Sequence, residues 1–585
     1  MTDDADPCLD WTENRAPVSR RFGDVYFSAE DGLAETRAVF LDGCGLPGAW
    51  IGRSHFVVAE LGFGSGLNIA ALLDLWRSSR PSNGRLHVFT VEAFPMSAPE
   101  ASRALSAWPE LGEAARALTE AWPSRTPGFH RLDLPAFGAV IDVAVMDVVE
   151  ALSAWSGRAD AWFLDGFSPA KNPRMWSDEV LALVRSRSAP GARAATFTVA
   201  GAVRRGLEAQ GFTVAKKPGH GRKRERLEAA LPGSRTHARE PRVAIVGAGI
   251  AGASLARALL AEGLRPVVVE CRTPGAGASG NPAALVTPRF DVGPGPEGAF
   301  FAQAFERAIA LYEAAPNVVL ERGALQLEAS PRDARRFDAI AGQSIWPSGA
   351  MNRVSPSDAD ELLGDVAGRG GLFIRDGLTI SPADVLDRFL GGCDLRAGRV
   401  ESLERGEGCW RLLDPDGREL AEAEVVCLAA GWGLSSLRPD LPLSPARGQV
   451  SWIDGRAARA AAWGGYVVPT RSGVLFGSTF DRGDSNTEVR PHDHDRNLAT
   501  LSLVRGALAA ELADRPWRGR ACIRATTRDH LPVAGQLEAG LWVLGGLGSR
   551  GFTTGPLLAE HLAAYILGLP SPLPQPIASR LQPHR

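Results

Sequence analysis

The chain has 585 residues, a formal net charge of −3 and 45% hydrophobic residues, which is ordinary for a globular protein of several domains. It has no apolar run of 18 residues or more and begins with an acidic, polar segment, so the sequence predicts neither a membrane span nor a signal peptide. Its seven cysteines are scattered without a C-x-x-C pair, which predicts a reducing, cytoplasmic setting and no metal site.

The first 235 residues are predicted to form an α/β domain around a parallel sheet. Strands are expected at residues 55–61, 85–91, 139–146 and 161–164. A glycine loop follows the first strand and leads into a predicted helix at 67–76. Acidic residues stand in or directly after these strands, where the ligand crevice of an open parallel sheet lies. These acids are Glu60, Glu92, Asp147 and Asp165.

The glycine loop reads E-L-G-F-G-S-G, with Glu60 ahead of three glycines, Gly62, Gly64 and Gly66. An acid in this place suits a cationic ligand without phosphate, and the loop resembles the S-adenosylmethionine loop of Rossmann-like methyltransferases. The resemblance implies that Glu60 lies near the amino-acid part of the ligand. It also implies that Glu92 binds the ribose hydroxyls and that Asp147 lies near the adenine. The alternative is a degenerate glycine turn in an unrelated α/β domain.

The stretch 165–173, D-G-F-S-P-A-K-N-P, follows a predicted strand and is expected to lie over the crevice. Methyl transfer to an amine needs a nitrogen lone pair aimed at the methyl group and an acceptor for the departing proton. Asp165 is the candidate for that role. Lys171 is expected to orient the loop or contact a phosphate, and the alternative is an ordinary solvated charge.

A basic cluster at residues 216–226 is predicted to be a turn or loop, because proline and two glycines interrupt it. Since neither half of the chain is strongly basic overall, such a patch is the expected contact for nucleic-acid phosphates. A solvated face or a linker is the alternative. The basic side chains of the cluster are Lys216, Lys217, Arg222, Lys223, Arg224 and Arg226.

Residues 243–270 read as a buried strand, a G-x-G-x-x-G motif, a helix and a second strand that ends in an acid. Gly247 permits the tight turn, Gly249 lets the backbone approach a pyrophosphate, and Gly252 lets the helix pack against the strand. Glu270 is placed to accept hydrogen bonds from ribose hydroxyls. The order of these parts predicts a dinucleotide-binding fold.

Two later stretches indicate that this dinucleotide is FAD. Residues 429–433 read A-A-G-W-G, and residues 546–555 are glycine-rich and open a helix predicted at 556–566. A chain that returns twice to the nucleotide fold is the plan of a two-lobed flavoprotein, and a helix N-terminus suits the N1–C2=O region of a flavin. The glycines expected at the cofactor are Gly431, Gly548 and Gly551.

The small-residue loop 275–281, which contains Ser279, resembles the loop that closes over the cofactor in amine-oxidising flavoproteins related to D-amino-acid and glycine oxidases. The same resemblance implies that Arg524 binds a substrate carboxylate, with Arg550 and Tyr466 in the same pocket. An arginine fork suits a carboxylate because two parallel hydrogen bonds fix its orientation. Alternatively, Tyr466 is a half-buried strand residue and Arg550 belongs to a surface turn.

Five motifs occur in a fixed order: D-V-Y-F-S (24–28), G-L-A-E-T-R (32–37), E-L-G-F-G-S-G (60–66), D-G-F-S-P-A-K-N-P (165–173) and G-R-K-R-E (221–225). Together they resemble the methyltransferase domain of the bifunctional family that makes 5-methylaminomethyl-2-thiouridine in tRNA, where it is fused to an FAD-dependent oxidoreductase. The resemblance implies an α/β chain with a Rossmann-like class I methyltransferase domain (1–235), a linker (236–241) and a two-lobed amine-oxidase-type domain with a mixed antiparallel sheet (242–585). The FAD-binding lobe is expected at about 242–290, 424–443 and 522–570, and the substrate lobe at about 300–420 and 444–520.

This resemblance implies two consecutive reactions at the wobble uridine of tRNA. The FAD-dependent half removes the carboxymethyl group of 5-carboxymethylaminomethyl-(2-thio)uridine, and the other half methylates the resulting amine with S-adenosylmethionine. The basic cluster is expected to hold the anticodon stem-loop, and a monomer is the working expectation for an oligomeric state that the sequence leaves open. Two alternatives remain: a fused enzyme acting on free small amines, or a chain in which one half serves only as a tRNA-binding module.

Overall fold

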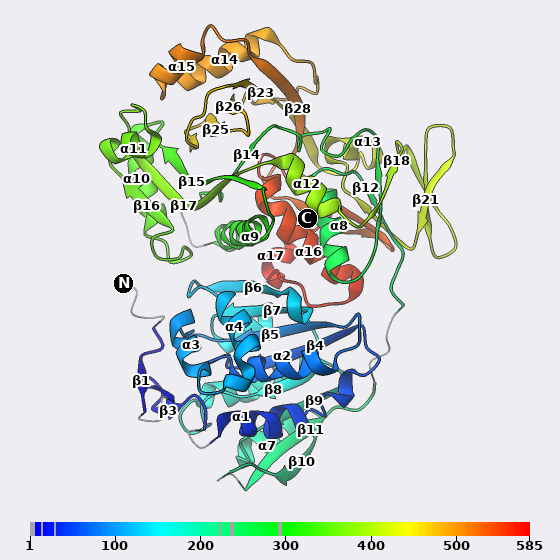
Figure 1. The fold of residues 1–585 in the computed structure, drawn as a ribbon. Helices are drawn as coiled ribbons and strands as arrows, with labels where there is room; N and C mark the ends of the chain where they lie inside the picture. The colour runs from blue at the N-terminus through cyan, green and yellow to red at the C-terminus, as the bar shows by residue number, and fades with distance from the viewer. Residues whose placement is uncertain (1–5, 13–15, 29–30, 222–223, 235–238, 291–294) are drawn as a thin grey trace. The chain divides into compact units, whose positions relative to one another are not determined.

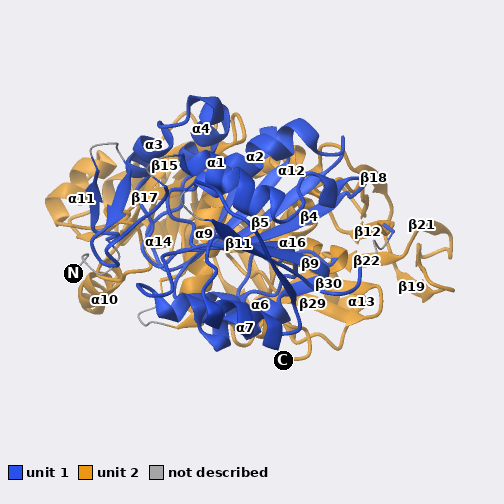
Figure 2. Cartoon of the chain, turned by 90° about the horizontal axis from the view of Figure 1, so that it is seen from below, with its two compact units in different colours: residues 1–239, 568–575 blue, residues 240–567, 576–585 orange. Residues whose placement is uncertain are grey.

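The computed structural model describes residues 6–12, 16–28, 31–221, 224–234, 239–290 and 295–585. The chain divides into two compact units (Figure 2). Unit 1 comprises residues 1–239 and 568–575, and unit 2 comprises residues 240–567 and 576–585. The division falls within the predicted linker 236–241, of which residues 236–238 lie outside the described residues. Among the helices that the structure describes, none is long and apolar enough to cross a lipid bilayer.

Unit 1 is built on an eight-stranded sheet in the order β10-β11-β9-β8-β4-β5-β7-β6 (Figure 1). The five central strands, from β7 across to β9, are parallel. From β4, the next strands β5 and β7 are added on one side, whereas the later strands β8 and β9 are added on the other, so the strand order switches between β4 and β8. Such a switch opens a crevice at the carboxyl ends of the strands. The strands are β4 (His55–Leu61), β5 (Arg85–Val91), β6 (Gly128–Leu134), β7 (Ala139–Val145), β8 (Ala159–Leu164), β9 (Ser188–Thr196), β10 (Thr213–Pro218) and β11 (Glu225–Ala230).

Helices cover both faces of this sheet because its central strands are apolar on both sides. On β4, Phe56 and Val58 belong to a core with α2 and α4, whereas Val57 and Ala59 belong to a core with α5, α6 and α7. A separate small sheet, β1 (Leu9–Trp11), β2 (Pro17–Ser19) and β3 (Asp24–Val25), precedes them. The helices are α1 (Gly32–Thr36), α2 (Leu67–Ser79), α3 (Ala98–Leu105), α4 (Gly112–Glu120), α5 (Val148–Ala154), α6 (Asp178–Ser186) and α7 (Gly201–Ala209).

The basic cluster at 216–226 forms only in part the turn or loop that the sequence predicts. Its two ends belong to the antiparallel strands β10 and β11, in which Lys216 pairs with Leu227 and Lys217 with Arg226. The strands form because β11 buries Leu227 and Ala229 and pairs with β9 on its other side. The predicted turn is found at residues 219–221, but the prediction was wrong for the two ends of the cluster, because the lysines fall on the edge strand, whose exposed side chains carry no hydrophobic alternation.

Unit 2 contains a six-stranded sheet in the order β18-β13-β12-β22-β30-β29, in which all neighbours are parallel except β29 and β30. The strands are β12 (Val243–Val246), β13 (Val267–Glu270), β18 (Asp394–Ala397), β22 (Val425–Leu428), β29 (Val533–Glu538) and β30 (Leu541–Gly545). Strand β12 lies beside both β13 and β22, so the predicted dinucleotide motif begins at the switch point of this sheet.

A ten-stranded sheet forms the second layer of unit 2, and its pairs are antiparallel except for β15 with β24. Its strands are β14 (Ala284–Val286), β15 (Val319–Leu327), β16 (Met351–Val354), β17 (Gly371–Ile380), β23 (Leu443–Asp454), β24 (Ala461–Ala462), β25 (Tyr466–Pro469), β26 (Gly473–Gly477), β27 (Asp481–Arg482) and β28 (Arg518–Thr527). A three-stranded sheet comprises β19 (Ser402–Arg405), β20 (Trp410–Leu413) and β21 (Glu419–Ala423). The prediction of an α/β chain with a mixed antiparallel sheet in its second half is confirmed.

The last long helix of unit 2, α16 (Gly551–Leu567), begins five residues before its predicted start at Pro556. Proline cannot donate the backbone hydrogen bond that would join it to the Phe552 carbonyl. The Tyr312 hydroxyl donates to that carbonyl instead, at 2.6 Å, so the helix tolerates the proline. The other helices are α8 (Ile250–Ala261), α9 (Pro296–Glu313), α10 (Pro331–Ala341), α11 (Pro356–Leu363), α12 (Pro382–Leu390), α13 (Leu434–Leu437), α14 (Pro491–Ser502), α15 (Gly506–Leu512) and α17 (Gln575–Ser579).

The replacement Gly252→Ala is expected to destabilise unit 2 by about 3 kcal/mol, because a Cβ at residue 252 would lie 1.8 Å from the Gly247 carbonyl oxygen. The matched control is Gly506→Ala at the start of α15, where a Cβ would meet open space. Thermal unfolding followed by circular dichroism measures both variants. Equal midpoints for the two would contradict the predicted packing role of Gly252.

Candidate active sites

Unit 1 contains a cavity of about 680 Å³ at the carboxyl ends of β4, β5 and β8. Four of the predicted site residues line it: Gly62, Gly64, Glu92 and Asp165. Gly62 has a φ of +90°, and a Cβ there would lie 3.1 Å from Gly166 Cα. The glycine loop and the loop of Asp165 therefore approach each other as closely as only glycine permits.

Glu60 does not line the cavity but lies beneath it, fully buried. Its carboxylate accepts hydrogen bonds from Thr90 Oγ1 at 2.7 Å and from Asn68 Nδ2 at 3.0 Å. The same Asn68 nitrogen also donates to Asp165 Oδ2 at 2.8 Å. Asn68, a lining residue that sequence reasoning missed, thus joins the two acids; its only signal in the sequence is a polar side chain within an apolar helical stretch.

Glu92 is held by backbone donors on both carboxylate oxygens. Gly64 N donates to Oε2 and Phe94 N donates to Oε1, each at 3.0 Å. Burial raises the pKa of Glu92, although these backbone hydrogen bonds oppose the shift. The acid is therefore fixed against the glycine loop at the wall of the cavity.

Asp147 and Gly66 do not line the cavity. Asp147 caps α5 by accepting a hydrogen bond from Val149 N at 3.0 Å, and it pairs with Arg174 at 2.8 Å. Gly66 precedes α2 with a φ of +77°, where a Cβ would lie 2.9 Å from Leu118. Asp147 follows β7 and Gly66 ends the glycine loop, as predicted. However, the Asp147 side chain caps α5, and the Gly66 backbone forms the start of α2.

Lys171 fixes the loop of Asp165 to the turn before β3. Its ammonium contacts the Gly23 carbonyl oxygen and lies 3.2 Å from Asp24 Oδ1, and Asp24 Oδ2 accepts from Ser168 N at 3.0 Å. Burial alone would raise the pKa of Asp24, but the hydrogen bond from Ser168 and the charge of Lys171 outweigh it and hold the pKa low. Of the roles considered for Lys171, these contacts favour orientation of the loop.

The basic hairpin β10–β11 borders the same cavity, since His220 and Gly221 in its turn are lining residues. Lys216 pairs with Glu225 at 2.8 Å, and Arg226 pairs with Glu228. Lys217 and Arg224 are exposed. The remaining two predicted contacts, Arg222 and Lys223, lie outside the described residues.

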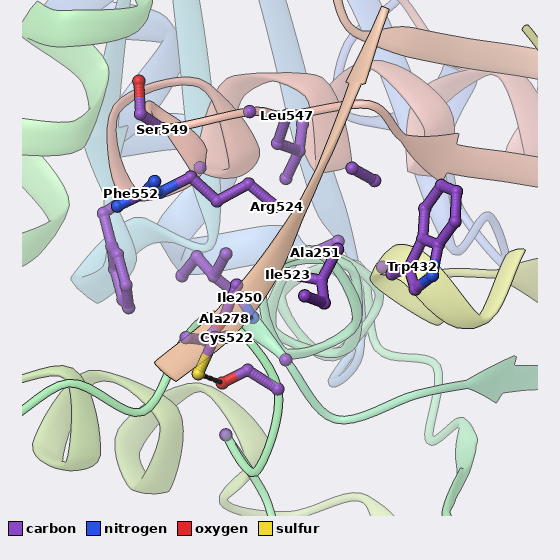
Figure 3. A pocket seen from close by; sticks show the side chains of 18 of the residues that line it. Ile250, Ala251, Ala278, Trp432, Cys522, Ile523, Arg524, Leu547, Ser549 and Phe552 are labelled. Carbon is purple, nitrogen blue, oxygen red and sulfur yellow. Dashed lines mark hydrogen bonds between the residues drawn. The ribbon is translucent and has the colours of Figure 1, made fainter. Parts of the chain in front are cut away.

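Unit 2 contains a cavity of about 1510 Å³ that extends along the glycine motif, the loop 275–281 and β28. Figure 3 shows Ile250 and Ala251 from the start of α8 together with Cys522, Ile523 and Arg524 from β28 around this space. Gly252, which packs α8 against β12, does not line it. The predicted residues that do are Gly247, Gly249, Glu270, Ser279, Gly431, Tyr466, Arg524, Gly548, Arg550 and Gly551.

The glycine motif leaves room for a dinucleotide. Gly247 has a φ of +104°, and a Cβ there would lie 2.7 Å from the Ala429 carbonyl oxygen. A Cβ on Gly249 would lie 3.2 Å from Ser279 Oγ, which accepts a hydrogen bond from Ile250 N. Glu270 Oε2 accepts from Ala248 N at 2.7 Å. Because side chains would fill this cradle, the residues present fit the predicted cofactor.

Strand β28 presents Arg520, Cys522 and Arg524 on one face, as the period of a strand requires. Arg520 donates to the carbonyl oxygens of Gly275, Ala276 and Gly277 at 2.6–3.1 Å, which fixes the small-residue loop at the cavity. Sequence reasoning missed Arg520, although its spacing of four residues from Arg524 on a strand signals a shared face.

Arg524 carries an enclosed nitrogen without a partner. Its Nη2 donates to Ser478 Oγ at 2.8 Å, whereas Nη1 is buried and has no hydrogen-bond partner among the described residues. Burial lowers the pKa of Arg524, which reflects the cost of desolvating a guanidinium, although an arginine keeps its charge. An anion at Nη1 would offset that cost.

Arg550 and Tyr466 line the same cavity. Arg550 Nη1 donates to the carbonyl oxygens of Thr287 and Pro288 at 3.2 and 2.9 Å. Burial raises the pKa of the Tyr466 hydroxyl, so the group stays protonated and able to donate a hydrogen bond. The cavity thus combines fixed cationic groups with a neutral hydroxyl.

Comparisons with known proteins agree with both sites. Residues 242–565 match the family described as FAD dependent oxidoreductase, and residues 109–232 match the S-adenosyl-L-methionine-dependent methyltransferase family. The chain is 55% identical to the tRNA 5-methylaminomethyl-2-thiouridine biosynthesis bifunctional protein MnmC of Caulobacter sp. (strain K31), over 100% of this chain and 98% of the relative. It is 56% identical to the MnmC protein of Caulobacter vibrioides, again over 100% and 98%.

The chain belongs to this bifunctional family. Unit 1 accordingly contains an S-adenosylmethionine-dependent methyltransferase and unit 2 an FAD-dependent oxidoreductase. Among solved structures, iminodiacetate oxidase from Chelativorans sp. BNC1 aligns with a TM-score of 0.52 at 24% identity, over 58% of this chain and 99% of that chain. That likeness supports the fold of unit 2.

The raised pKa of Glu60 is expected to make the stability of the protein depend on pH. Burial, reinforced by the charge of Asp165, raises the pKa of Glu60 from 4.5 to about 8. A folded-state pKa above the unfolded value means that stability is fully present below pH 4.5 and is lost as the pH rises toward 8. Glu60→Gln, which mimics the protonated acid, should therefore unfold at the same temperature as the wild type at pH 4.5 and at a higher temperature at pH 8.5. A constant difference across this range, measured by calorimetry, would argue against the shifted pKa.

Proposed function

We propose that this chain modifies the wobble uridine of tRNA in two steps. Unit 2 removes the carboxymethyl group from the 5-carboxymethylaminomethyl substituent, and unit 1 then methylates the amine that remains. The order follows from the chemistry, since the first reaction exposes the primary amine that the second reaction requires. Membership of the bifunctional family supports the assignment of both activities.

The observation that carries the proposal for unit 2 is the enclosed Nη1 of Arg524, which has no partner among the described residues. The group to be removed bears a carboxylate, and a charge-assisted hydrogen bond from Nη1 would bind it. Tyr466 stands at the same cavity with a protonated hydroxyl as a second donor. These contacts orient the carbon between the amine and the carboxylate. FAD, when bound, would supply the hydride acceptor for that carbon. Hydrolysis of the resulting C=N bond by water would then release the carboxymethyl group as glyoxylate and leave the free amine.

In unit 1, Asp165 is the proposed proton acceptor. Asn68 donates to its Oδ2 and thereby orients the carboxylate, while Lys171 and Asp24 fix the loop that carries it. Glu92 and the backbone around Gly64 are the proposed contacts of S-adenosylmethionine, which supplies the methyl group when bound. Asp165 removes the proton from the amine and keeps its lone pair available.

The basic hairpin supports tRNA as the substrate. Its turn borders the cavity of unit 1, so phosphates bound by the hairpin would lie next to the nucleotide in that cavity. Lys217 and Arg224 are the exposed basic side chains of its described part, whereas Lys216 and Arg226 also pair with acids. We therefore assign the exposed pair to phosphate contacts.

Mass spectrometry of wobble nucleosides tests the function. Incubation of tRNA that carries the carboxymethylaminomethyl group should yield the aminomethyl nucleoside without S-adenosylmethionine and the methylaminomethyl nucleoside with it. Arg524→Met should slow the first reaction about 100-fold, because the charge-assisted hydrogen bond to the carboxylate is lost, and should leave methylation of aminomethyl-tRNA at the wild-type rate. An unchanged carboxymethylaminomethyl peak with the wild-type protein would refute the oxidase assignment.

Replacement of both Lys217 and Arg224 by glutamine is expected to weaken tRNA binding and to reduce the slope of log K against log salt by one to two, as about one released counterion per lost phosphate contact predicts. Titration of tRNA at several salt concentrations measures the slope. The matched control is Arg411→Gln on β20, an exposed arginine that lines neither cavity. If the double variant had the same salt dependence as the control, the hairpin would not contribute to the tRNA-binding surface.

A further inference from the structure

Of the aromatic side chains that line the cavity of unit 1 without being buried, four are in ring contact with one another: Phe22, Tyr26, Phe94 and Phe167. The rings of Phe22 and Phe167 are stacked, with centroids 4.7 Å apart and an interplanar angle of 29°. Tyr26 meets Phe167 edge-on at 5.1 Å. Partly exposed aromatic rings at a cavity wall offer flat apolar surface to a ligand.

The stacked pair is rigid because polar contacts fix both of its ends. Phe22 lies in the turn before β3, and Phe167 lies in the loop of Asp165. Lys171 and Asp24 join these two segments, and Asp24 also accepts the hydrogen bond from Ser168, the neighbour of Phe167. On the other side, Trp176 Nε1 donates to the Phe167 carbonyl oxygen at 2.9 Å. A surface fixed in this way loses little entropy when it binds a ring.

Both rings line the same cavity as Asp165, the proposed proton acceptor. Phe167 follows Asp165 by two residues, a separation of at most about 7 Å along the chain. The amine of an aminomethyl uracil is two bonds from the base. A base on this surface would therefore lie in the cavity that Asp165 also lines, with its amine directed to the same space. Phe94, in contrast, follows Glu92 and lies tilted by 54° to Phe22, outside the stack.

We propose that Phe22 and Phe167 form the surface on which the uracil base of the tRNA substrate stacks during methyl transfer. The inference rests on the proposed function and adds the feature that distinguishes a nucleotide from a free small amine, which has no ring to stack. Every base has a π-face, so stacking on aromatic side chains is a general means of holding an unpaired nucleotide. The adenine of S-adenosylmethionine is the competing occupant, and the test separates the two.

The test compares Phe22→Leu, which keeps an apolar side chain but loses the ring, with the matched control Phe22→Tyr, which keeps the ring. Phe22→Leu should lower kcat/KM for aminomethyl-tRNA about 5- to 150-fold, as stacking energies of ~1–3 kcal/mol per base imply, and should leave the Kd of S-adenosylmethionine unchanged. Phe22→Tyr should stay within about twofold of the wild type. Phe167→Leu examines the second ring in the same way, and removal of the carboxymethyl group by unit 2 serves as the internal measure of intact protein.

Two results would overturn the inference. A wild-type kcat/KM for tRNA in Phe22→Leu would show that the ring does not contact the base. A parallel loss of S-adenosylmethionine affinity would assign the rings to the adenine instead. A wild-type protein that transfers no methyl group to this tRNA would refute the proposed function itself, which distinguishes that failure from the other two.

Discussion

Both units depend on the same backbone constraint: two loops cross at the switch point of a parallel sheet with no room for a side chain. In unit 1 a Cβ on Gly62 would lie 3.1 Å from Gly166 Cα, and in unit 2 a Cβ on Gly247 would lie 2.7 Å from the Ala429 carbonyl oxygen. The crossing brings together residues that are about one hundred or more positions apart in the sequence. Each cavity forms beside such a crossing, so the glycines define where a ligand can lie.

Much of the fold could be predicted because the central strands are continuous apolar runs with clear ends. Strands β4, β5 and β12 have the predicted bounds, since each is buried on both faces. The errors occur where a tertiary contact replaces a local signal. Pro556 indicates a helix start, but Tyr312, distant in sequence, satisfies the carbonyl that proline leaves free. The edge strand β10 is stabilised by β11 rather than by its own exposed side chains.

The candidate sites divide in the same way. Backbone positions such as Gly62 and Gly249 could be predicted, because a glycine motif states a steric requirement that any chain must meet. The hydrogen-bond partners of side chains could not be predicted, because the sequence does not show which distant residues come close together in the fold. Glu60 therefore lies beneath the cavity, hydrogen-bonded to Asn68, and Asp147 caps a helix. The enclosed nitrogen of Arg524 likewise depends on Gly448, where a Cβ would lie 2.3 Å from Nη1.

The charges of the two cavities suit the two proposed steps in the order that the chemistry requires. A substrate that retains its carboxymethyl group is a zwitterion, whose carboxylate Arg524 attracts and Asp165 and Glu92 would repel at close range in a partly buried cavity. Loss of the carboxymethyl group leaves a cationic amine, for which these preferences are reversed. The amine then gains from the two acids of unit 1 and would be repelled by the guanidinium of unit 2. Electrostatics alone would thus release the intermediate from one site and favour its binding at the other.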